Sequence, residues 1–183
     1  MRALTTFAGV AIGALLLSGC LPQQPTETPP PEATAAPIFA SDEEALAAAT
    51  AAYAAYLAMS DQIAAEGGAN PERLKPFVTA DQLASASISF SVYQEKGLRA
   101  QGISTFDAVS VVQVDQAPNF ANVDIYLCLD VSKVRAIDKT GSVVTSDDRP
   151  DRLPLEIGFE VDDSVPPELK LARSEPWSGF NFC

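Results

Sequence analysis

The hydrophobic pattern changes its period part-way along the chain, and this change most constrains the fold. Between Ser41 and Gly97 the apolar residues recur every three to four positions, as on one face of an α-helix. Beyond Gly102 they recur every second position, which is the spacing of a half-buried β-strand. Helices come first and strands follow, so we expect an α+β domain whose helices and strands are segregated.

Capping signals locate the helix ends. Ser41–Glu44 and Thr79–Gln82 both have the form of a capping box, in which the first and fourth side chains bind free amide groups. Gly67-Gly68 and Gly97 follow the two helical patterns, and glycine suits the left-handed conformation that ends a helix. Asn70-Pro71 predicts a further short turn, because proline favours a first helical position.

The second part of the chain predicts long strands with turns at Gln116–Asn119 and Asp138–Gly141. For the first strand we expect one face to consist of Phe106, Ala108, Ser110, Val112 and Val114. The apolar faces of the next two long strands consist of Val123, Ile125, Leu127, Leu129 and Val131, then of Leu155, Ile157, Phe159 and Val161. Consecutive strands pair readily, so we expect N-terminal helices packed on a curved, cone-like antiparallel sheet.

The first forty residues have a different composition. An uncharged apolar run from Ala3 to Leu17 follows Arg2, which is typical of a signal peptide and shorter than the about 20 residues of a membrane-spanning helix. Residues 21–37 are rich in Pro, Thr, Gln and Glu and have almost no large apolar side chains. Such a segment cannot build a core, and Pro29–Pro31 favours an extended tether.

The tetrapeptide Leu17-Ser18-Gly19-Cys20 resembles the lipobox of bacterial lipoproteins. The resemblance implies cleavage between Gly19 and Cys20 and attachment of diacylglycerol to the Cys20 sulfur. Two acyl chains give stable anchoring, so we expect the chain on the extracytoplasmic face of a cell membrane. The expected divisions are a signal peptide, a lipidated tether and one α+β domain, at residues 1–19, 20–40 and 41–183.

The folded part resembles the nuclear-transport-factor-two-like superfamily (SnoaL-like, cystatin-like cone), as found in many actinobacterial lipoproteins. The resemblance covers roughly Ser41 to Cys183 and rests on three helices before the strands, on the strand Asp124–Asp130 and on the tail Glu175–Cys183. It implies a curved sheet wrapped around helices, with a conical pocket open at one end. Members include isomerases, dehydratases, epoxide hydrolases and non-enzymatic domains, so the fold does not choose the activity.

Two cysteines remain after Cys20, and we expect them to form a disulfide. Cys128 lies within a predicted strand and Cys183 is the last residue. Two cysteines in one domain outside the cytoplasm usually pair, and this bridge would pin the C-terminal tail across the sheet. The alternative is a catalytic Cys128 thiol, but the chain contains no histidine to activate it.

The absence of histidine also excludes Ser-His-Asp and Cys-His catalysis and a zinc site of His and Cys, so we expect no metal or cofactor. Carboxylate chemistry remains, because Asp124, Tyr126 and Asp130 share one strand face. An Asp/Tyr pair serves ketosteroid isomerases. The competing interpretation is that Tyr126 packs and the aspartates are solvated.

Two further segments are candidates for sites. The acidic loop Ser146–Asp151 lacks the spacing and the glycine of an EF-hand loop, so we interpret it as a solvated turn and not as a calcium site. Trp177 either lines the mouth of a pocket or docks the C-terminal tail on the sheet.

The net charge is −12, and no cluster of Lys or Arg interrupts it. This charge repels phosphate backbones, so we expect no nucleic-acid partner. Our main expectation is a non-catalytic domain that binds a cell-envelope protein or a small hydrophobic ligand. The alternatives are a small-molecule isomerase or lyase with Asp and Tyr in a conical pocket, and an accessory domain of a cell-wall enzyme.

Overall fold

The computed structural model of this chain describes residues 36–183 apart from 163 and 165. The expected signal peptide, the cleavage site at Gly19 and Cys20 and the lipidation of Cys20 lie outside the described residues. The elements are α1 Asp42–Ala65, the 3-10 helix η1 Pro71–Leu74, α2 Ala80–Lys96, β1 Arg99–Gln101, β2 Thr105–Ala117, β3 Phe120–Asp130, β4 Arg135–Ile137, β5 Arg152–Val161 and β6 Leu169–Pro176. In this part of the chain, neither helix combines the length and the hydropathy that a membrane-spanning segment requires.

Both long helices begin and end at the predicted caps. The Ser41 Oγ accepts a hydrogen bond from the Glu44 amide at 3.3 Å, and the Thr79 hydroxyl accepts one from Gln82 at 3.4 Å. The Glu44 carboxylate accepts from the amide one residue before Ser41, so the first box closes slightly outside its usual position. Gly97 ends α2 with φ 63°. The third helix of the family pattern is only the four-residue η1.

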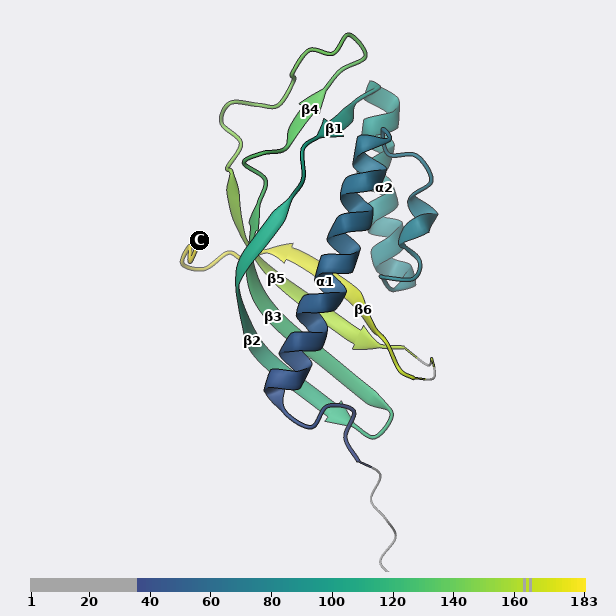
Figure 1. The fold of residues 1–183 in the computed structure, drawn as a ribbon, viewed down its shortest axis with the longest axis vertical. Coiled ribbons are helices and arrows are strands. Elements are labelled where there is room, and N and C mark those ends of the chain that lie inside the picture. The colour runs from purple at the N-terminus through teal and green to yellow at the C-terminus, as the bar shows by residue number, and fades with distance from the viewer. Residues whose placement is uncertain (1–35, 163, 165) are drawn as a thin grey trace, which may run out of the picture. The chain divides into compact units, whose positions relative to one another are not determined.

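The long strands form an antiparallel meander in the order β2-β3-β5-β6, and both long helices cover one face of it (Figure 1). Most side chains of β3 and β5 that face the helices are buried, as their alternation predicted, and Leu129 and Val161 are partly buried. The fully buried ones are Ala121, Val123, Ile125, Leu127 and Ile157. The expected α+β class, with helices packed on a curved antiparallel sheet, is therefore confirmed. The sheet curves but does not close (Figure 1).

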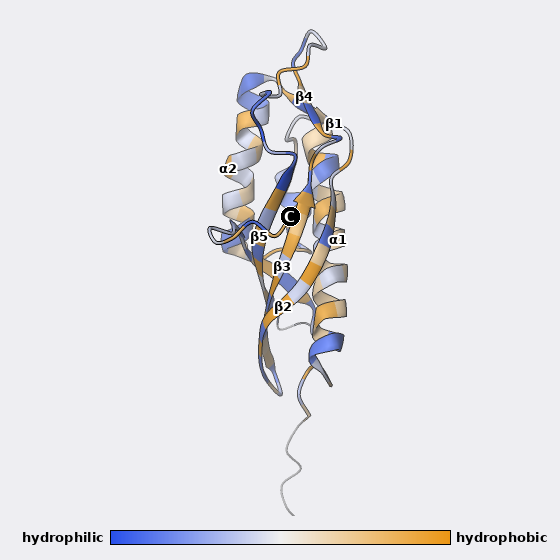
Figure 2. Ribbon diagram, turned by 90° about the vertical axis from the view of Figure 1, so that its left-hand side faces the viewer, coloured by the Kyte–Doolittle hydropathy of each residue, from blue (hydrophilic) through white to orange (hydrophobic). Residues whose placement is uncertain are grey.

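The two helices contribute unequally to the core. Helix α1 buries Tyr53 and Ile63 almost completely and also buries Ala45 and Ala49, whose small side chains let the helix lie close to the sheet. Helix α2 buries only Ala86 and Phe90, and it is visibly more polar than α1 (Figure 2). Helix α2 also makes little direct contact with α1. Because α2 packs loosely against α1, space remains between the two helices.

The prediction for strand β2 was wrong in its middle. Ala108, Ser110 and Val112 are exposed, although we expected them on the face of Phe106 and Val114. The pairing with β3 shifts register between Asp107 and Ser110 and again between Val111 and Gln113. Each bulge inserts a residue and reverses the alternation, so the first shift turns the pattern over and the second restores it. The side chains of β2 that pack on the core are Phe106, Val109, Val111 and Val114.

A separate two-stranded ribbon, β1 paired with β4, extends beyond one end of the main sheet (Figure 1); β1 precedes β2 in the chain, and β4 lies in the connection from β3 to β5. The predicted turn Asp138–Gly141 follows β4, and the Gly141 amide donates to the Asp138 carbonyl at 3.0 Å. Ile137 and Val143 form an isolated bridge across this turn. The sequence did not predict β1 or β4, because three residues are too few to show a period.

Candidate binding groove

A groove of about 710 Å³ lies between α1, α2 and the end of β6. This volume falls within the roughly 300–1,000 Å³ of typical ligand sites. Hydroxyl and carboxylate side chains from all three elements line it. The polar residues of the lining are Tyr56, Ser60 and Asp61 of α1, Asp81, Gln82, Ser85, Ser89 and Tyr93 of α2, Ser104 of the connection before β2, and Arg173, Ser174 and Glu175 of β6.

Three polar residues of α1 form one wall of the groove. Tyr56 and Ser60 are four residues apart, which places them one above the other on the same helix face. Burial raises the pKa of Tyr56, and the nearby Ser60 hydroxyl offsets part of that rise. The Ser60 Oγ is buried and has no hydrogen-bond partner of standard geometry among the described residues. Both oxygens of the adjacent Asp61 accept hydrogen bonds at 2.7 Å from Ser104, one from its amide and one from its hydroxyl.

The wall that α2 provides is rich in serine. The Ser85 hydroxyl donates to the Asp81 carbonyl at 3.2 Å, and the Ser89 hydroxyl donates to the Ser85 carbonyl at 3.4 Å. These protons are therefore used within the helix, as is common for serine in a helix interior. The hydroxyl oxygens keep free lone pairs, so this wall offers mainly hydrogen-bond acceptors.

Arg173 lies at the β6 rim of the groove, but carboxylates surround its guanidinium. It contacts Glu156 and Asp124 at 2.9 Å each and Glu175 at 3.6 Å. Asp124 of β3 and Glu156 of β5 lie on the face of the sheet opposite the helices, and Glu175 is paired with Glu156 on that same face. The one cation of the groove lining is thus already neutralised within the protein.

The three side chains that sequence reasoning proposed for catalysis do not line this groove. Asp124, Tyr126 and Asp130 project from the opposite face of the sheet. Asp124 is paired with Arg173, and Asp130 with Arg152 at 3.3 Å. Hydrogen bonds from Ser132 and the charge of Arg152 lower the pKa of Asp130. The two aspartates are engaged in ion pairs, and nothing brings them to a common site with Tyr126.

The C-terminal tail covers Tyr126. The Trp177 and Phe182 rings lie on the Tyr126 ring, with centroids 4.7 Å and 5.6 Å away. Cys128 and Cys183 lie at the distance of a disulfide, with Cα atoms 5.5 Å apart, and Cys128 is fully buried. Tyr126 packs against the tail, and Trp177 docks the tail on the sheet, on the side away from the helices (Figures 1 and 2).

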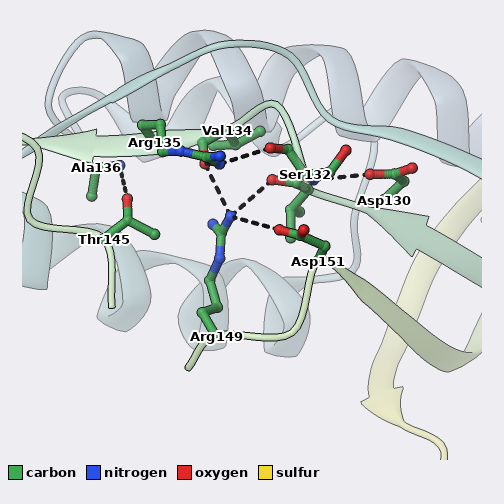
Figure 3. A network of polar contacts seen from close by, with 9 residues as sticks. Asp130, Ser132, Val134, Arg135, Ala136, Thr145, Arg149 and Asp151 are labelled. Carbon is green, nitrogen blue, oxygen red and sulfur yellow. Dashed lines mark hydrogen bonds and ion pairs between the residues drawn. The ribbon is translucent and has the colours of Figure 1, made fainter. Parts of the chain in front are cut away.

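The acidic loop Ser146–Asp151 is organised around an arginine. One guanidinium nitrogen of Arg149 donates to the carbonyl oxygens of Val131 and Val134 at 2.9 Å and 3.0 Å and lies 3.8 Å from Asp151 (Figure 3). The carbonyl and carboxylate oxygens of this loop could resemble the ligands of a cation site, but the Arg149 guanidinium already binds them. The described residues contain no group of three or more potential metal ligands.

Sequence reasoning missed the groove. Tyr56 and Ser60 belong to the helical spacing of the predicted first helix, and such spacing predicts a face that packs on the core and not a groove. The serines at every second position from Ser85 to Ser91 are unusual within a helix and were the available signal. The groove itself arises from the spacing between α1 and α2, which no local pattern encodes.

The fold and the groove define an α+β domain with a hydroxyl-lined groove on the helical side of an open sheet. No family model and no curated protein matches this chain. Among solved structures, the intermembrane space region of the chloroplast protein ARC6 is similar in fold, with a TM-score of 0.52 and 15% identity. The match covers 72% of this chain and 97% of that one.

Two of the four tyrosines should resist ionisation. Burial raises the pKa of both Tyr53 and Tyr56 above the ordinary value. A raised pKa in the folded state means that the stability from these groups is complete below pH about 10 and is lost as the pH rises further. We expect the tyrosinate absorbance of two residues to develop only with alkaline unfolding. The Tyr56→Phe variant should shift that unfolding to higher pH; an unchanged profile would contradict the assignment.

Proposed function

We propose that this chain is a lipid-anchored extracytoplasmic lipoprotein whose folded domain binds a polar ligand, without catalysis, in the groove between α1, α2 and β6. The observation that carries the binding role is the convergence of hydroxyl groups from three elements on one groove. A concave site on which several polar groups converge is the usual form of a ligand site.

The anchoring role rests on Leu17–Cys20 and on the tether that follows it. The Cys128–Cys183 pair agrees with an oxidising compartment. The similar region of ARC6 is an intermembrane space region, which agrees with a place outside the cytoplasm.

Binding is favoured over catalysis by the state of the groove carboxylate. Both oxygens of Asp61 are occupied by Ser104, so this residue holds the connection before β2 and is not poised to take a proton. The Tyr56 pKa is raised, so its hydroxyl stays neutral. The lining is polar, which favours a polar ligand over the small hydrophobic one expected from the sequence.

The anchor is tested by the Cys20→Ser variant expressed in a bacterial host. The wild-type chain should fractionate with membranes, and its N-terminal peptide should carry the mass of a diacylglyceryl group. The variant should lose the lipid and keep the uncleaved signal peptide, because only a thiol forms the thioether. Cys183→Ser serves as the matched control, since it removes a cysteine and should retain the lipid. An unmodified wild-type Cys20 would contradict the proposal.

The groove is tested by filling it. The Ser85→Trp variant places a large ring in the groove, and Ala84→Trp places the same ring on the neighbouring exposed position outside the lining. In ligand-observed NMR with a fragment collection, Ser85→Trp should abolish binding that Ala84→Trp retains. If no fragment that binds the wild-type chain loses its binding in Ser85→Trp, the groove is not a binding site.

A further inference from the structure

We propose that the groove selects an organic cation with several N–H donors, such as an alkyl chain bearing primary ammonium or guanidinium groups. This inference rests on the binding role proposed above and names the class of ligand. A free polyamine and the Lys or Arg side chains of an envelope protein share this chemistry.

The first argument is the supply of hydrogen-bond acceptors. The Ser85 and Ser89 protons are used within α2, and the Ser104 proton is used by Asp61. Each of these hydroxyls therefore meets a ligand mainly with oxygen lone pairs. A ligand that complements such a lining is one that donates, and ammonium and guanidinium groups are donors only.

The second argument is the charge of the lining. Asp61 and Asp81 contribute two carboxylates from the helices, and Arg173 is the only cation among the lining residues. That cation is enclosed by carboxylates from β3, β5 and β6 and has little charge to offer. An anion would meet uncompensated repulsion here, and a net charge of −12 extends the same field beyond the groove.

The third argument is the aromatic part of the lining. Tyr56, Phe90 and Tyr93 all border the groove, and Phe90 is itself buried. Aromatic faces attract cations and pack against methylene chains, so they suit both parts of an alkylamine. A groove of about 710 Å³ has room for an aliphatic chain that carries charged groups.

The test measures calorimetric binding to the full chain with four probes: spermidine, an acetylated trilysine peptide, neutral sucrose and anionic citrate. Spermidine, the peptide or both should bind, whereas sucrose and citrate should not. Spermidine alone identifies a free polyamine as the source, and the peptide alone identifies a partner's side chains. Either result supports the proposal.

The Asp81→Asn variant removes the lining carboxylate that neither Ser104 nor Arg173 occupies. Cation affinity should fall at least about tenfold, as expected when a ligand cation loses a charged partner. The matched control Glu95→Gln removes the same charge from α2 outside the lining. Equal losses in both variants would show general charge attraction and overturn the inference.

The failure of the ligand class and the failure of the binding role give different results. If sucrose or citrate binds, neither cation binds, and Ser85→Trp abolishes that binding, the proposed ligand class is overturned but the binding role of the groove stands. If none of the four probes binds and no fragment loses its binding in Ser85→Trp, both the ligand class and the binding role are overturned.

Discussion

Replacement of Cys183 by serine should lower the free energy of unfolding by about 4 kcal/mol, less any strain in the bridge. The disulfide closes a loop with a sequence separation of 55 residues, and its loss gives the unfolded chain more conformations. We expect the midpoint of guanidinium unfolding to fall clearly in the variant. Reduction of the wild-type chain should have the same effect.

The same substitution should loosen the tail locally. Apart from the disulfide, Trp177 and Phe182 hold the tail by packing on Tyr126, and the Trp177 amide donates to the Pro154 carbonyl at 2.8 Å. Trp177 is the single tryptophan, so its fluorescence reports on this contact alone. Its emission should shift to the red in the variant under native conditions.

A control distinguishes the bridge from the side chain. Under reducing conditions the wild-type chain and Cys183→Ser should unfold at the same midpoint, because neither has the cross-link. Equal midpoints for oxidised and reduced wild-type chain would show that the bridge does not stabilise the domain.

The Gly68→Ala substitution should cost about 2–5 kcal/mol, because two penalties combine. Gly68 has φ 81°, a left-handed conformation that alanine adopts at a cost. A methyl group there would also collide with the backbone carbonyl of Phe90 on α2. The Gly68 amide closes the end of α1 by donating to the Ile63 carbonyl at 2.8 Å, so the chain cannot easily move away.

Gly141→Ala separates the two penalties. Gly141 also has a left-handed φ, 87°, but a methyl group there meets nothing within 4 Å. We expect this control to cost about 1–2 kcal/mol, the conformational penalty alone. Equal losses of stability in the two variants would show that the contact between Gly68 and α2 is unimportant.

Gly68 also links stability to the groove. Its contact with Phe90 sets how closely α2 approaches the end of α1, and both helices line the groove. The disulfide-bonded tail lies on the opposite face of the sheet. We therefore expect Gly68→Ala to weaken ligand binding, whereas Cys183→Ser, which also loses stability, should bind like the wild-type chain. Both are measured at a temperature where both variants are folded.

The elements with strong local signals could be predicted from the sequence. Ser41, Thr79 and Gly97 act at the helix ends as expected, because a cap is a contact between residues a few positions apart. The alternation in β3 and β5 gave the buried faces, because both strands are regular. Strand β2 escaped the same reasoning, since its two register shifts follow from its pairing with β3 and not from its own residues.

The sequence by itself determined the α+β class, the caps, the central strands and the cysteine pair, because each depends on local spacing or on the residue types available. Only the tertiary structure decided that Asp124 pairs with Arg173 and that the C-terminal tail covers Tyr126. It also decided that Tyr56, Ser60 and two serines of α2 line one groove. These outcomes depend on the distance between α1 and α2 and on which strand faces which. Such distances are set by backbone contacts such as that of Gly68 with the Phe90 carbonyl, between residues that are apart in the chain and meet only when it is folded.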